Sequence, residues 1–362
     1  MTAPVTAESL ARALGLSRAT VSIVLRGDAE RRKISPATTR RVLDAAREYN
    51  YVPNQAARML RRQRTDLVGV VLPDFRLDWA EGVMDGMLDV FGRSTVTPFV
   101  AIHRFNPDLF RKEILSALQR RDDAIICYPI PGMNDLYAQV RAMGIPLIFI
   151  GDRPAGYADA HWVVWDAGAA ATAAVRHLVD EGCRRIGFLG MDFPMHQSRA
   201  RVKAYKAVLA AAGRPVNEQW ICAPAASKPT LQIIDEGLAH IFGGTGPKPD
   251  GLFVLNDGLA LPALDRLSRL GVRVPEDVKL VGMGDVPLAG QHGVGLTTAR
   301  EPLPEMGRAA AEQALACIAE PSGPLARRVI VCNDLRIRRT TVGQRWRQDE
   351  PGAFNYGDVT SK

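Results

Sequence analysis

From residue 66 onward the sequence alternates between short apolar runs and helical patterns. The apolar runs are rich in Val, Ile and Leu, which is typical of strands buried on both faces of a sheet. They occupy residues 67–74, 124–129, 146–152, 185–191, 251–257 and 279–285. Apolar residues recur with helical spacing over residues 79–92, 108–121, 133–144, 169–182, 198–213 and 259–271. Because alternating strands and helices form parallel sheets, we expect an α/β fold with parallel sheets, divided into two similar lobes.

Aspartates end four of these apolar runs. They are Asp74, Asp152, Asp257 and Asp285. In open α/β sheets ligands bind beyond the carboxyl ends of the strands, where these residues fall. Each aspartate alone could instead cap the following helix or turn. As a set they favour a polar cleft that suits a ligand rich in hydroxyl groups.

Positive charge is concentrated at the start of the chain. Residues 1–64 hold 13 Lys/Arg against 5 Asp/Glu, a net charge of +8, whereas the remaining residues carry −1. A solvated basic tail would explain this distribution. A folded basic module attached to a neutral body instead indicates a polyanionic partner, most often nucleic acid.

The first fifty residues predict three short helices. Thr6 is placed to cap the first helix and Gly15 to end it. Ser17 follows after a tight turn and is placed to cap a second helix, and Ser35 with Pro36 starts a third. We expect the caps Thr6 and Ser17 to contact DNA as well. Two short helices joined by a glycine turn predict a helix-turn-helix DNA-binding domain.

The second helix is composed of residues that suit a position in the major groove of DNA. Thr20 and Ser22 are short enough to approach phosphates, and Val21, Val24 and Leu25 can pack against the first helix. This leaves three side chains for the base edges, namely Arg18, Ala19 and Ile23. The basic loop that follows is expected to contact the DNA backbone through Arg26, Arg31, Arg32 and Lys33.

The N-terminal segment resembles the DNA-binding headpiece of the lactose-repressor (LacI/GalR) family of bacterial transcription regulators. The resemblance rests on TVS in the second helix, YVPN after the third and the following AARML. It implies a sequence-specific regulator, in most cases a repressor, that binds an inverted-repeat operator in double-stranded DNA as a homodimer. The family often has a polar residue where this chain has Ile23, which can contact a thymine methyl group but cannot hydrogen-bond to guanine.

The resemblance also divides the chain. Residues 1–52 correspond to the headpiece, 53–65 to a hinge, 66–341 to a two-lobe core like a periplasmic sugar-binding protein, and 342–362 to a polar tail. In that kind of core both lobes are doubly wound parallel sheets and the ligand lies between them. In the family the hinge forms a helix on operator DNA and inserts a leucine into the minor groove. By position that leucine is Leu60, and Asn54 and Ala57 join it as DNA-contacting residues. An ordinary basic linker is the alternative for this segment.

The family's effector site carries over to several residues of the core. SRARVKAY matches the segment that provides an effector-contacting arginine, here Arg201, and LNDGLAL makes Asp257 a second contact. Trp79 falls where the family often has an aromatic residue lining the pocket, although it could equally be a core residue. Asp74, Asp152 and Arg153 are weaker candidates; Asp166, Asp285 and His196 are weaker still. The implied effector is a small polar metabolite, in the first place a sugar or sugar derivative.

Other classes of protein find little support. Neither a catalytic motif nor a phosphate-binding loop is present, so we expect no enzyme activity and no cofactor. Five scattered cysteines without C-x-x-C spacing argue against a zinc site and fit a reducing cytoplasm, and no apolar run is long enough for a membrane span. The alternatives are a sugar-binding or sugar-modifying protein with an incidental basic head, and an architectural DNA-binding protein that responds to no ligand.

Overall fold

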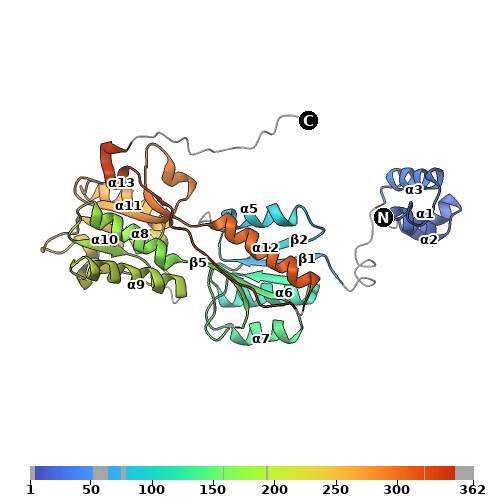
Figure 1. Cartoon of the computed structure of the whole chain (residues 1–362), viewed down its shortest axis with the longest axis horizontal. Coiled ribbons are helices and arrows are strands. Elements are labelled where there is room, and N and C mark those ends of the chain that lie inside the picture. Colours follow the sequence, from blue (N-terminus) through green and yellow to red (C-terminus); the bar gives the residue numbers. More distant parts are fainter. Residues whose placement is uncertain are drawn as a thin grey trace. The chain divides into compact units, whose positions relative to one another are not determined.

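The computed structural model describes residues 5–51, 64–74, 79–157, 159–192, 195–321 and 323–346. The chain divides into two compact units, Met1–Thr65 and Asp66–Lys362 (Figure 1). The predicted DNA contacts Asn54, Ala57 and Leu60 lie outside the described residues. None of the described helices is long and apolar enough to cross a membrane.

The first unit is the predicted three-helix headpiece. Its helices are α1 (Ala7–Leu14), α2 (Arg18–Leu25) and α3 (Pro36–Glu48). Each begins at the predicted cap, because Thr6, Ser17 and Ser35 accept backbone N–H groups of Ser9, Thr20 and Thr38. The helices pack around a small apolar core formed by Leu10, Ala11, Val21, Val24, Ala29, Val42 and Ala45.

The first lobe of the second unit is a six-stranded parallel sheet in the order β11-β5-β4-β3-β1-β2. Its strands are β1 (Leu67–Leu72), β2 (Thr97–Ile102), β3 (Ala124–Cys127), β4 (Leu147–Ile150), β5 (His161–Trp165) and β11 (Arg327–Ile330). Helices α5 (Trp79–Phe91) and α12 (Leu303–Ala319) pack together against the sheet. Helices α6 (Pro107–Arg120) and α7 (Asn134–Ala142) form a second pair (Figure 1).

The second lobe repeats this plan in the order β12-β10-β9-β8-β6-β7. Its strands are β6 (Ile186–Leu189), β7 (Ile221–Cys222), β8 (Gly251–Val254), β9 (Lys279–Gly284), β10 (Thr297–Arg300) and β12 (Leu335–Arg336). All pair in parallel except β12, which is antiparallel to β10. Helices α8 (Ala167–Asp180) and α9 (His196–Ala211) pack as one pair, and α10 (Thr230–Phe242) and α11 (Asp257–Arg269) as another.

The chain passes between the two sheets three times, after β5, after β10 and after β11. The last described elements, α13 (Arg339–Val342) and a short 3-10 turn, Gly343–Arg345, lie on the second lobe. Arg345 pairs with Glu181, and the Trp346 ring lies 6.2 Å from the ring of His292. Side chains therefore pack on this lobe up to Trp346, four residues into the segment predicted as a polar tail.

Candidate functional site

The start of α2 presents the residues predicted to read DNA. Arg18 and Ala19 are exposed, and Ile23 is partly exposed on the same helix. The Ser17 hydroxyl holds the first turn by accepting the Thr20 N–H at 3.0 Å and by bonding to the Thr20 hydroxyl at 2.9 Å. The helix terminus is therefore fixed in place while its side chains stay accessible.

The remaining headpiece candidates lie beside this helix. Thr6 is exposed and caps α1, Ser22 is partly exposed within α2, and exposed Arg26 follows the end of α2. Arg26 Nε lies 3.7 Å from the carboxylate of Asp28, so its charge is partly offset within the loop.

In the core, Trp79, Arg201 and Glu301 meet between the lobes. The Trp79 indole N–H donates to Glu301 Oε1 at 3.0 Å, and an Arg201 Nη2 lies 3.9 Å from Glu301 Oε2. Trp79 begins α5 of the first lobe and Arg201 belongs to α9 of the second. Glu301 directly follows β10, where the chain crosses back to the first lobe.

Arg201 is held in a buried position with part of its hydrogen-bonding capacity unused. Its side chain is 11% exposed, and its guanidinium carbon lies 5.6 Å from the centre of the Trp165 ring. Its Nε has no hydrogen-bond partner among the described residues. A buried donor without a partner is costly, so this atom marks a position where an acceptor would be favourable.

Asp152 and Arg153 face α9 from the end of β4. The Asp152 carboxylate is 1% exposed, and its Oδ1 accepts the Arg153 N–H at 2.6 Å. Burial raises the pKa of Asp152, and the backbone amides of His196 and Gln197 at the start of α9 partly oppose that rise. Its Oδ2 makes no well-formed hydrogen bond with the described residues. Arg153 Nη2 lies 3.2 Å from His196 Nε2, so His196 contacts the opposite lobe.

An aromatic wall lines the first-lobe side of this cluster. The rings of Trp79 and Tyr128 meet edge to face with centres 5.1 Å apart. Gly151 allows this packing, because a Cβ atom there would lie 2.7 Å from Trp79 Cζ2 and 2.8 Å from Tyr128 Cε2. Burial, together with the negative charge of Asp152, raises the pKa of Tyr128, which therefore remains a neutral phenol.

The structure gives Asp257 a structural part in the second lobe. Its Oδ2 accepts the backbone N–H groups of Asp285 and Val286 at 2.7 and 3.2 Å, and its Oδ1 accepts the Thr298 hydroxyl at 2.7 Å. Burial raises the pKa of Asp257 to about 6. The carboxylate thus holds together the ends of β9 and β10, and Gly284 with φ +143° permits its close approach.

The other predicted aspartates also lie at strand ends. Asp74 is partly buried after β1. Asp166 caps α8 by accepting the Ala169 N–H at 2.8 Å. Asp285 forms ion pairs with Arg336 and Arg338, the shorter at 2.7 Å. Helix capping therefore accounts for the contact of Asp166, and ion pairing accounts for those of Asp285.

Glu301 is the member of the cluster that sequence reasoning missed. Burial raises the pKa of its carboxyl, while Arg201 and the Trp79 N–H oppose that rise. The signal was available, since an acidic residue follows the β-branched pair Thr297-Thr298. That short strand lacks the Val, Ile and Leu run by which the other strands were predicted.

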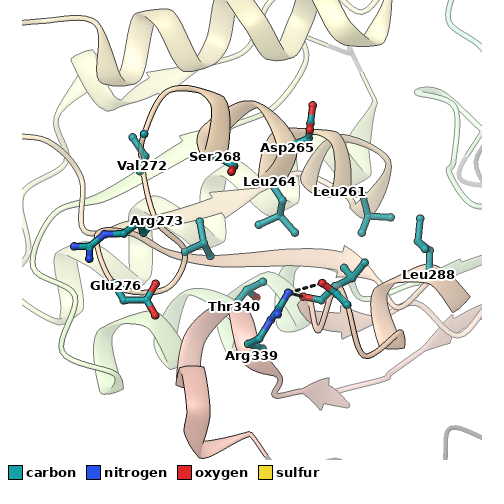
Figure 2. Close-up of a pocket in the computed structure, with 14 residues that line it drawn as sticks. Leu261, Leu264, Asp265, Ser268, Val272, Arg273, Glu276, Leu288, Arg339 and Thr340 are labelled. Atoms are coloured by element: carbon teal, nitrogen blue, oxygen red, sulfur yellow. Dashed lines mark hydrogen bonds between the residues drawn. The ribbon is translucent and has the colours of Figure 1, made fainter.

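A separate cavity of about 600 Å³ lies on the second lobe. Figure 2 shows Leu261 and Leu264 pointing from α11 towards Arg339, which donates to the carbonyls of Gly293 and Val294. None of Trp79, Asp152, Arg201 and Glu301 lines it. The cavity is therefore distinct from the polar cluster between the lobes.

Comparison with known proteins agrees with this architecture. Residues 8–54 match the family described as bacterial regulatory proteins, lacI family, and residues 175–341 match a periplasmic binding protein-like domain. The HTH-type transcriptional regulator PtxS of Pseudomonas aeruginosa is 30% identical over 340 residues, which cover 93% of this chain and 96% of the relative. The chain belongs to the LacI family. As a member it is a DNA-binding transcriptional regulator, in agreement with the prediction of a regulator and not an enzyme.

Solved structures of LacI-family proteins share the fold. A complex of the transcriptional regulator CelR with cellobiose is 25% identical with a TM-score of 0.68, over 93% of this chain and 99% of that one. A lac repressor dimer bound to operator and an anti-inducer has a TM-score of 0.76 over the same shares, at 21% identity. The latter likeness supports the fold of headpiece and core.

Proposed function

We propose that this LacI-family regulator is a homodimeric repressor of the cytoplasm whose affinity for an inverted-repeat operator changes when a small polar metabolite binds between the core lobes. A sugar or sugar derivative is the class of effector. In this proposal residues 1–52 bind DNA, 53–65 form the hinge, 66–341 bind effector and dimerise, and 342–362 form a C-terminal tail.

The observation that carries the effector site is a pair of buried atoms without a well-formed hydrogen bond to the described residues, Arg201 Nε and Asp152 Oδ2. One is a donor and the other an acceptor, and a hydroxyl group can satisfy either. A polyhydroxylated ligand that stacks on Trp79 would use both. The cellobiose bound by the relative CelR belongs to this chemical class.

A ligand at this position would affect the angle between the two lobes. Trp79 belongs to the first lobe, Arg201 to the second, and Glu301 to a crossing between them. A ligand that contacts all three favours one angle between the lobes over another. It shifts the equilibrium between the two lobe arrangements only by the difference in its affinity for them.

The α11 cavity supports the homodimer. Its lining includes Leu261, Leu264 and Leu288, and Leu288 is 44% exposed. An exposed leucine at the edge of a depression that further leucines line is typical of interaction surfaces. A lac repressor dimer is known among the structural relatives, and we assign the α11 surface to self-association of this chain.

The function is tested by measuring DNA binding and effector binding on the full chain. An operator selected from random DNA should be an inverted repeat, and it should bind one dimer. A thermal-shift screen with sugars, sugar acids and polyols should find a ligand that stabilises the protein by about 2.7 kcal/mol at 100 times its Kd. A protein that binds its selected DNA but changes affinity with none of these compounds would contradict the proposed effector class.

A further inference from the structure

The polar cluster between the lobes consists of Trp79, Asp152, Arg201 and Glu301. Its positive groups are already balanced by carboxylates of the chain. Arg201 lies 3.9 Å from Glu301 Oε2, and the start of α9 faces the Asp152 carboxylate. These are the two features of the cluster that would attract an anionic ligand, since a guanidinium and a helix N-terminus both bind carboxylates. This step rests on the effector site proposed above.

The buried part of the cluster carries net negative charge. Asp152 is 1% exposed, and the side chains of Arg201 and Glu301 are 11% and 12% exposed. The charges of Asp152, Glu301 and Arg201 each shift the pKa of Tyr128, so two carboxylates and one guanidinium share these buried surroundings. A carboxylate added to this space would meet like charge at low dielectric, and such repulsion is larger than at the surface.

We propose that Glu301 makes the cleft selective for uncharged polyhydroxylated ligands over their carboxylate derivatives. Glu301 offsets the positive charge of the guanidinium that a ligand carboxylate would need, and it also accepts the Trp79 indole N–H. A hydroxyl group needs no charge partner, and it can accept from Arg201 Nε or donate to Asp152 Oδ2. Glu301 thus acts as a specificity-determining residue.

Glu301→Gln tests the negative charge of Glu301 separately from its hydrogen bond. The glutamine amide oxygen can still accept the Trp79 N–H, so the contact between lobe and crossing is retained while Arg201 loses its counter-charge. Glu305→Gln is the matched control. Glu305 lies in the first turn of α12 and pairs with Arg300 at 3.0 Å, and among the described residues it forms no hydrogen bond or ion pair with Trp79 or Arg201. Circular dichroism and DNA binding establish that both variants fold.

The experiment compares ligand pairs by isothermal titration calorimetry on the full chain. The probes are glucose with gluconate, galactose with galactonate, and ribose with ribonate. We expect wild type and Glu305→Gln to bind a neutral member at least tenfold more tightly than its acid. Glu301→Gln should shift that ratio towards the acid by at least tenfold.

Two results would overturn the inference and leave the proposed function intact. Tighter binding of an acid by wild type would show that Glu301 does not exclude anions, and an unchanged ratio in Glu301→Gln would remove its role in selectivity. A third result, in which folded, DNA-binding wild type binds no member of any pair, would overturn the sugar-class effector and the inference with it.

Discussion

The Trp79 indole N–H and Glu301 Oε1, 222 residues apart in the sequence, are hydrogen-bonded at 3.0 Å. The bond joins the first lobe to the chain segment that returns from the second. Because Glu301 also pairs with Arg201, a change at any of the three side chains alters a contact between lobes.

Trp79→Phe should lower thermal stability while preserving the fold. Phenylalanine keeps the aromatic packing but removes the donor, which leaves a buried Glu301 oxygen without its hydrogen bond. Loss of one partner of a bond to a charged group costs about 1.5–3 kcal/mol. Differential scanning fluorimetry measures the effect, and Trp162→Phe in the same lobe is the control because it does not touch Glu301. Equal melting temperatures for Trp79→Phe and wild type would count against the bond.

Gly151→Ala should weaken effector binding at least tenfold. The added Cβ would lie 2.7 Å from Trp79 and 2.8 Å from Tyr128, so the aromatic wall must move. Gly156→Ala is a matched control, since Gly156 has φ +84° against +82° for Gly151 but has open space around its Cβ position. If both variants lost the same affinity for a ligand found in the screen, backbone strain and not ring displacement would be the cause.

Asp257→Asn should change the pH dependence of stability. Burial raises the folded pKa of Asp257 from 3.8 to about 6, so this group favours folding most below pH 4 and that contribution is lost as pH rises through 6. The difference amounts to about 3 kcal/mol. Urea unfolding of wild type and Asp257→Asn between pH 4 and 7 measures it. Parallel stability curves for the two proteins would show that Asp257 has an ordinary pKa.

The sequence predicted the headpiece better than the cleft, for a physical reason. A cap such as Ser17 is a local interaction within four residues, so its spacing is visible in the chain. The part played by Asp257 depends on Thr298, 41 residues away, and on the turn after β9. The resemblance assigned Arg201 and Trp79 to the proposed effector site, but Glu301 follows a short polar strand that apolar periodicity does not reveal.

Arg18→Ala should reduce binding to the selected operator by about 1–3 kcal/mol if Arg18 contacts a base edge. Arg18 is exposed at the first position of α2, whose end is fixed by Ser17. Arg12→Ala is the control, because Arg12 lies on α1 with a side chain that is 84% exposed. Fluorescence anisotropy on operator and random DNA separates specific from non-specific binding. Equal losses for both variants would indicate a general charge effect.

Leu288→Glu should dissociate the homodimer. A charge at a surface leucine of the α11 cavity cannot be buried against a second copy without a large desolvation cost. Met143→Glu is the control, since Met143 is 53% exposed on the other lobe. Analytical ultracentrifugation should give monomers for the first variant and dimers for the second. A dimer that survives Leu288→Glu would place the interface elsewhere.

The most direct test of coupling between cleft and operator is operator affinity with and without the tightest ligand from the sugar screen. We expect the ligand to change wild-type affinity at least tenfold. Without ligand, Arg201→Ala should bind the operator with an affinity within about tenfold of wild type, or ~1.4 kcal/mol. With ligand, its operator affinity should not change. Arg199→Ala, an exposed change on the same helix, should respond as wild type does. A full ligand response in Arg201→Ala would contradict the account, because the effector would then act from another site.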